Sequence, residues 1–135
     1  MSKSTIYVAN TTSQDVSVDG TINLGSIIRR FGPNLNLRGS NIQVAGAGYY
    51  DIDANFTVAP TADSEVTITA YRNNVPIPGA TATETAAAAG DTLNLSINAI
   101  VREGCSCCDG ISNISFVLTG VESAVTNAAI VVEKL

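Results

Sequence analysis

The chain contains no histidine in its 135 residues. Histidine is the most common general base near neutral pH and a frequent metal ligand, and a Ser-His-Asp arrangement cannot be built without it. Its absence disfavours hydrolytic chemistry. We expect a protein that is not an enzyme and that carries no cofactor.

Carboxylates could still hold a hard cation. Asp51 and Asp53 alternate along one extended stretch and so point to the same side, where Asp63 or Glu65 could join them. The sequence has no Asp-x-Asp-x-Asp-Gly loop of the kind that binds calcium. The preferred interpretation is that these are solvated carboxylates.

Charge is scarce, and positive charge is scarcer than negative. Charged residues make up 14% of the chain, and seven Lys and Arg oppose twelve Asp and Glu, for a formal net charge of −5. This balance argues against a nucleic-acid partner. No apolar run approaches the roughly 18 residues of a membrane-spanning helix, so no membrane insertion is expected. The N-terminal residues lack the apolar core of a signal peptide, which predicts assembly in a cytoplasm.

Cysteine is confined to residues 104–110 (GCSCCDG), as Cys105, Cys107 and Cys108. Three thiolates this close could bind Zn²⁺ or Cu⁺, but a four-ligand zinc site would need a further group, and the chain has no other Cys or His. A Cys105–Cys108 disulfide is feasible and would leave one thiol for a neighbouring subunit. The preferred interpretation is reduced, structural thiols in a loop between two strands, with disulfide pairing and metal binding as the alternatives.

The sequence is rich in alternating apolar and polar residues, most clearly over residues 46–60 (GAGYYDIDANFTVAP). A period of two is typical of a half-buried antiparallel strand. Gly46 and Gly48 mark the turn before it, and Pro60 marks its end. One face would hold Tyr50, Ile52, Ala54, Phe56 and Val58, and the other Tyr49, Asp51, Asp53, Asn55 and Thr57.

The same period recurs along the rest of the chain. The expected inward rows are Ile6 and Val8; Leu35, Leu37, Ile42 and Val44; Val66, Ile68 and Ala70; Leu93, Leu95, Ile97, Ala99 and Val101; and Ile114, Phe116 and Leu118. Val16, Val18, Ile22 and Leu24 predict a short strand pair or hairpin. Residues 127–135 are apolar on both faces, which predicts a strand covered on both sides.

Turn signals separate these rows. Residues 72–74 predict a turn, and Pro76 and Pro78 exclude a central strand directly after it. Residues 81–89 are predicted to be a strand end and a loop. With 45% hydrophobic residues the chain can bury a core, so we predict an all-β sandwich of about 8–10 antiparallel strands, in one domain over residues 1–135.

Arg29 and Arg30 follow Ile27 and Ile28, where the alternation breaks. A basic pair could contact an anion. The preferred interpretation is a solvated strand edge, or a bridge to one of the carboxylates.

Several short motifs resemble a known superfamily. Residues 48–52 (GYYDI) resemble the Gly-x-Tyr-x-aromatic signature of the C1q and tumour necrosis factor (TNF) jelly rolls, and residues 88–95 (AAGDTLNL) resemble their Gly-Asp turn before an apolar strand. Residues 75–79 and 129–135 look closer to the bacterial and prophage branch, represented by the C-terminal domain of the collagen-like spore-surface glycoprotein of bacilli. The resemblance covers residues 20–135 and leaves residues 1–19 as an N-terminal strand or arm.

The resemblance implies a jelly roll that forms a homotrimer and acts as a structural, adhesive or receptor-binding head. Two features depart from the pattern: Ile52 and Ala54 replace aromatics, and no Gly-x-y collagen stalk occurs before residue 20. Apolar positions outside the core rows also predict an association surface. The interface candidates are Tyr49, Tyr71, Ile100, Val117 and Val131.

The leading interpretation is a non-enzymatic structural or attachment protein of a bacteriophage virion, as a capsid decoration, head or tail-fibre component assembled in the host cytoplasm. Its partners would be its own copies, a major capsid protein and a host receptor or glycan. One alternative is a structural protein of a bacterial spore coat or cell surface. The other is a soluble carbohydrate- or ligand-binding module, with Tyr49, Tyr71 and residues 72–74 as its platform.

Overall fold

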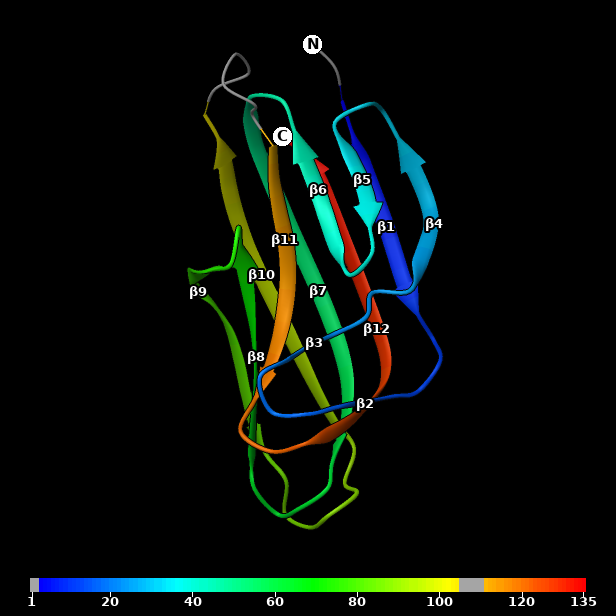
Figure 1. The fold of residues 1–135 in the computed structure, drawn as a ribbon, viewed down its shortest axis with the longest axis vertical. Coiled ribbons are helices and arrows are strands. Elements are labelled where there is room, and N and C mark those ends of the chain that lie inside the picture. Colours follow the sequence, from blue (N-terminus) through cyan, green and yellow to red (C-terminus); the bar gives the residue numbers. More distant parts are fainter. Residues whose placement is uncertain (1–2, 105–110) are drawn as a thin grey trace.

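The computed structural model describes residues 3–104 and 111–135, which form two packed antiparallel sheets with no helix among them (Figure 1). Sheet A has the order β10 (Leu93–Glu103), β7 (Gly48–Pro60), β12 (Ser123–Lys134), β1 (Thr5–Asn10), β4 (Ser26–Phe31), with β2 (Gln14–Val16) beside β12. Sheet B has the order β5 (Leu35–Arg38), β6 (Asn41–Ala45), β11 (Ile111–Thr119), β8 (Glu65–Arg72), β9 (Val75–Thr85), with β3 (Gly20–Thr21) beside β11. The predicted all-β sandwich is confirmed, and the described residues form twelve strands where about 8–10 were expected.

The predicted organising strand is β7, near the middle of sheet A. Its five inward residues, from Tyr50 to Val58, are at most 1% exposed, whereas Tyr49 is 55% exposed. Gly46 and Gly48 have φ of +100° and +147°, which favours glycine, as the turn before the strand requires. The other predicted inward rows also line the core, with Leu37, Leu93 and Ala99 only partly buried at its margin.

The turn from β8 to β9 is a two-residue hairpin turn. Asn73 and Asn74 have φ of 51° and 66°, and Arg72 pairs with Val75 across the turn. Two central residues with positive φ suit the right-handed twist of a hairpin, and asparagine tolerates this conformation. The strand with the two prolines, β9, is the edge of sheet B, as the prolines predicted.

The predicted hairpin over residues 16–24 is wrong. β2 pairs with β12 in sheet A, whereas β3 pairs with β11 in sheet B, so this segment crosses from one sheet to the other. Asp19, at φ 66°, turns the chain there, and its backbone N–H donates to the Leu118 carbonyl at 2.8 Å. Val18 is consequently 47% exposed and does not continue the buried row.

The prediction that the C-terminal strand is covered on both sides is also wrong for the single chain. β12 lies between β7 and β1, and Ala128, Ile130 and Val132 are buried in the core. On its other face Ala129 and Val131 are only half-buried. In the described part of the chain, this face of β12 therefore keeps part of its apolar surface exposed to solvent.

Each sheet ends in two edge strands, so the sandwich has two open sides. The edge strands β4 and β5 flank one open side, at the right in Figure 1, and β9 and β10 flank the other, at the left. The start of β1 and the end of β12 lie at one end of the sandwich, and the loops after β7 and β9 lie at the opposite end.

Candidate functional site

The face of sheet A turned away from sheet B carries an apolar stripe at its centre. Tyr7 pairs with Val131, and Ala9 pairs with Ala129, so these four side chains are cross-strand neighbours on β1 and β12. All four are half-buried in the single chain. We call this set the central stripe. It offers an uncharged surface suited to association with another protein.

The five predicted interface residues do not form one patch. Tyr49, Ile100 and Val131 lie on the outer face of sheet A, where Tyr49 and Ile100 are 55% and 58% exposed. Tyr71 and Val117 alternate with buried residues of β8 and β11, so they lie on the outer face of sheet B. The tyrosines at 49 and 71 therefore cannot share one sugar platform.

Polar side chains cover the β7 and β10 half of the same outer face. Ser96 Oγ donates to Asn55 Oδ1 at 2.7 Å, and Thr57 Oγ1 donates to Asn94 Oδ1 at 3.2 Å. Asn98 Nδ2 donates to Asp53 Oδ1 in the same ladder. This row of cross-strand hydrogen bonds stiffens the sheet beside the central stripe.

Three carboxylates gather next to the stripe. Asp51 pairs with Glu133 across β7 and β12, and Asp53 lies two residues further along β7. Partial burial and the charges of Asp53 and Glu133 raise the pKa of Asp51 above its ordinary value. In the part of the chain that the structure describes, no group of three or more Cys, Asp and Glu side chains is arranged to hold a metal ion.

A groove of about 470 Å³ lies on the open side between β9 and β10. Pro76, Ile77 and Pro78 form one wall, and Ile100 and Arg102 form part of the other. The wall is largely apolar, and Arg72 and Arg102 are the charged residues of the lining. Such a groove suits a ligand that is mainly apolar with a polar or anionic end.

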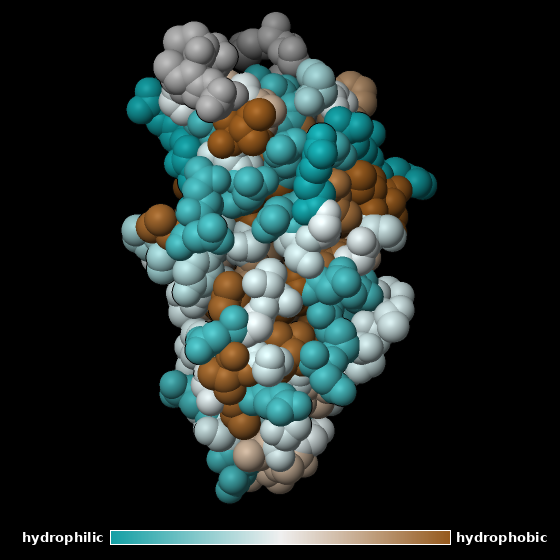
Figure 2. All heavy atoms as spheres, in the orientation of Figure 1, coloured by the Kyte–Doolittle hydropathy of each residue, from teal (hydrophilic) through white to brown (hydrophobic). Residues whose placement is uncertain are grey.

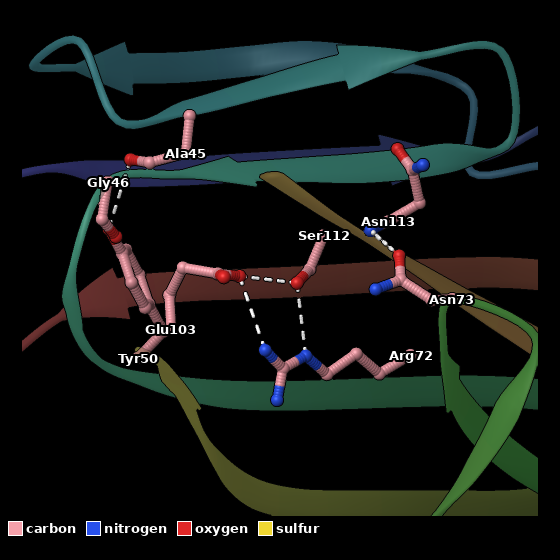
Figure 3. A network of polar contacts seen from close by, with 8 residues as sticks. All are labelled: Ala45, Gly46, Tyr50, Arg72, Asn73, Glu103, Ser112 and Asn113. Atoms are coloured by element: carbon pink, nitrogen blue, oxygen red, sulfur yellow. Dashed lines mark hydrogen bonds and ion pairs between the residues drawn. The ribbon is translucent and has the colours of Figure 1, made fainter. Parts of the chain in front are cut away.

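A polar network behind this groove joins the two sheets (Figure 3). Arg72 of β8 forms an ion pair with Glu103 of β10 at 3.3 Å, and its Nε donates to Ser112 Oγ of β11 at 3.0 Å. Ser112 Oγ in turn donates to Glu103 Oε2. The Glu103 carboxylate that accepts this bond is already paired with Arg72, and Ser112 is only 1% exposed, so the hydroxyl is out of reach of solvent and the network joins the two sheets.

Tyr50 lies at the same end of the sandwich. Its hydroxyl donates to the Gly46 carbonyl at 2.8 Å, with the Ala45 carbonyl oxygen at 3.2 Å (Figure 3). Burial and the nearby Glu103 carboxylate raise the pKa of the phenol, which keeps it protonated as a donor. Tyr50 therefore anchors the turn before β7.

Two other predicted features have different outcomes. Arg29 and Arg30 lie on the edge strand β4, as the edge interpretation expected, and Arg30 Nε donates to the Leu35 carbonyl at 2.6 Å. Among the described residues the ion pair is Arg72–Glu103, so the alternative bridge to a carboxylate is not formed. Cys105, Cys107 and Cys108 lie outside the described residues.

Comparison with known proteins gives matches in structure alone. No protein-family model and no curated protein matches the sequence. Eiger TNF from S. frugiperda is 12% identical, with a TM-score of 0.68 over 98% of this chain and 91% of its own. The globular domain of zebrafish complement 1qA protein is 7% identical, with a TM-score of 0.69 over 95% and 94%. PRD1 vertex protein P5 is 16% identical, with a TM-score of 0.58 over 98% and 96%.

These likenesses establish the fold. The chain is a jelly-roll sandwich of the TNF and C1q type, which confirms the predicted fold class and, at the level of the fold, the resemblance seen in the sequence. Identities this low say nothing finer about activity or partners. No helix in the described part of the chain is long and apolar enough to cross a membrane.

Sequence reasoning missed three of the four central-stripe residues and the Arg72–Glu103 pair. Tyr7 and Ala9 alternate with buried Ile6 and Val8, so an outward apolar pair was visible in the pattern. Its importance depends on the pairing of β1 with β12, which brings the two ends of the chain together. The ion pair joins residues 31 positions apart, and no local pattern indicates it.

Proposed function

We propose that this chain is a non-enzymatic structural or attachment protein on the surface of a larger particle, and that the particle is a bacteriophage virion. In this role it would be a capsid decoration, head or tail-fibre component that docks on a major capsid protein and presents a free end to a host receptor or glycan. The likeness to PRD1 vertex protein P5, a protein named for a vertex, supports a place on such a particle. The TNF and C1q likenesses support a binding or structural module.

The observation that carries the proposal is the outer face of sheet A. Its central stripe is uncharged. Tyr49 and Ile100 lie on the same face beyond the three carboxylates and are more than half exposed. A lone chain would leave this apolar surface in water, whereas an assembly would bury it. Ser112, the hydroxyl of the Arg72 network, is 1% exposed, so a substrate in solution could not reach it.

We further propose that the assembly is a homotrimer. A closed ring of three buries two different surfaces of each protomer, because each copy contacts one neighbour on either side. The outer face of sheet A supplies one such surface. Tyr71 and Val117, on the outer face of sheet B, are candidates for contact on a second surface.

Labelling of purified particles tests the proposed location. Gold-conjugated antibody raised against the folded chain should decorate the surface of intact virions that carry it. Absence of the chain from purified virions, with decoration of spores or bacterial cells instead, would favour the spore-coat or cell-surface alternative, including the bacterial collagen-like branch. The same antibody pre-absorbed with the chain is the control.

The ligand-binding alternative has one observation in its favour, the groove between β9 and β10. Its apolar wall and the Arg102 guanidinium could receive a small anionic or amphiphilic ligand. A glycan array with the wild-type chain and the Arg102→Ala variant tests it. Specific binding that the variant loses would favour this function, and no binding on the array would disfavour it.

A further inference from the structure

The edge strand β4 is unusually apolar for a strand that faces solvent. All six of its residues are exposed, with Ile27 at 38%, Ile28 at 44% and Phe31 at 67%. These are three of the nine large apolar side chains found exposed in the described residues. β4 pairs with β1 on one side, and no described strand pairs with it on the other. Its free edge therefore presents both unpaired backbone groups and apolar side chains.

The other three edge strands are protected against such pairing. β9 carries Pro76 and Pro78 and an irregular pairing with β8, and β5 is only four residues long. β10 runs alongside β9 across the open side of the sandwich. Short edges, prolines and covering segments are the usual devices against unwanted strand pairing. β4 is six residues long and has no proline, and its protection consists of its two arginines and a bulge in its pairing with β1.

The charge around β4 is positive in a molecule that is negative overall. Residues 20–50 contain Arg29, Arg30 and Arg38 but no Asp or Glu, although the whole chain has a net charge of −5. β1 and β5, the neighbours of β4, also contain no carboxylate. The carboxylate nearest to Phe31 in the pairing pattern is Glu133, two strands away and so about 10 Å off. Figure 2 shows apolar and hydrophilic residues side by side at this margin, at the right of the view.

The pairing with β1 also tells which side chains share a face. Arg29 pairs with Tyr7 and Phe31 pairs with Thr5, so Arg29 and Phe31 lie on the outer face of sheet A. Arg30 pairs with buried Ile6 and is tied to the Leu35 carbonyl. Within residues 3–104 and 111–135, Arg29 donates one hydrogen bond, of 3.1 Å, to the carbonyl of Ile28, which leaves most of its donors available.

We propose that β4 is a docking edge for an extended segment of a partner protein, which adds to sheet A as a further strand. On the outer face this segment would place a carboxylate opposite Arg29 and an apolar side chain two residues away, opposite Phe31. Charge selects the occupant: pairing of β4 with β4 of a second copy would bring four arginines together, whereas an acidic segment neutralises them. The inference rests on the proposed attachment role, and it identifies the chemistry of the docking partner.

The test uses a defined eight-residue peptide with blocked ends. Every second residue is threonine, and the positions between are glutamate and valine in turn, so that both face the same side of a strand. A second peptide carries lysine in place of each glutamate. Fluorescence anisotropy with the whole chain should show that the glutamate peptide binds about tenfold or more tightly than the lysine peptide, with a difference that shrinks as salt is added. Amide hydrogen exchange should slow in β4 when the glutamate peptide is bound.

Two charge-reversal variants provide the matched comparison. Arg29→Glu should weaken binding of the glutamate peptide by about tenfold or more and should tighten binding of the lysine peptide. Arg102→Glu makes the same change in net charge on β10, at the opposite side of the sandwich, and should change binding less than about twofold. Equal binding of the two peptides, equal losses in the two variants, or slowed exchange at another edge would overturn the proposal. None of these results tests the proposed trimer, because the oligomeric state is measured separately by sedimentation.

Discussion

At the scale of single residues, Phe56 helps to hold the two sheets together. The centroid of its ring lies 5.3 Å from the ring centroid of Phe116 of sheet B, the two ring planes are inclined at 59°, and both side chains are at most 1% exposed. Replacing Phe56 by Ala should lower the free energy of unfolding by about 3–5 kcal/mol, because a large cavity would open in the core. Asp53→Ala, three residues earlier on the solvent face, should change it by no more than about 0.5 kcal/mol. Urea denaturation of both variants measures the contrast, and equal losses would mean that the face assignment of β7 is wrong.

The Asp51 carboxyl gives a second prediction at this scale, about pH. Its raised pKa means that the fold binds a proton there more tightly than the unfolded chain does, so this carboxyl favours the fold at low pH. That contribution is complete below its ordinary pKa of about 3.9 and is lost as the pH rises through the raised value. Asp51→Asn should therefore raise the melting temperature at pH 7, and the gain should vanish near pH 3.

Thermal melts across this pH range test the prediction. Asp63→Asn removes the same charge from an exposed loop and is the matched control. A gain at pH 7 that is the same in both variants would show that net charge, and not the crowding of Asp51 by Asp53 and Glu133, is responsible.

At the scale of strands and sheets, the Arg72–Glu103 pair links the edge of sheet A to sheet B. The Glu103 side chain is only 10% exposed, so loss of its partner would leave a carboxylate nearly buried and unpaired. Arg72→Met should lower the free energy of unfolding by about 1–3 kcal/mol. The loss is smaller than for a fully buried pair, because the arginine itself is partly exposed. Adding Glu103→Gln to this variant should recover part of the loss, because the amide is neutral and can still bond to Ser112. A double variant no more stable than Arg72→Met would contradict the assigned role of the charge.

At this scale the sequence predicts strands well and their partners poorly. Alternation alone identified the buried rows of β7, β8 and β10, because a period of two fixes which face each side chain joins. β2 and β3 have three and two residues, too few for any period, and their partners β12 and β11 lie about a hundred residues further along the chain. The predicted hairpin was wrong for this reason.

The candidate site was predictable to a similar extent. Alternation correctly placed Tyr49 and Ile100 outside the core, but only the strand order shows that Tyr71 and Val117 belong to the opposite sheet. The expectation that β12 is covered on both sides came from its apolar outward residues, Ala129 and Val131. A single chain cannot cover them, since its own layers are already used on the inner face.

At the scale of the whole molecule, the central claim is that three copies associate and bury the outer face of sheet A. The claim rests on the apolar central stripe and the half-buried outer face of β12, and it supports the proposed place on a larger particle. A charge in the middle of the stripe should prevent association, because it would be buried without a partner. Val131→Glu puts one there, and Ser13→Glu adds the same charge in an exposed turn as the control.

Sedimentation velocity at micromolar concentration is the most direct test of the central claim. The wild-type chain, of 13.9 kDa, should sediment as a single species of about 42 kDa, and so should Ser13→Glu. Val131→Glu should sediment as a folded monomer, with an unchanged circular dichroism spectrum. A wild-type chain that sediments as a well-behaved monomer would contradict the trimer and, with it, the main support for a role on a particle surface.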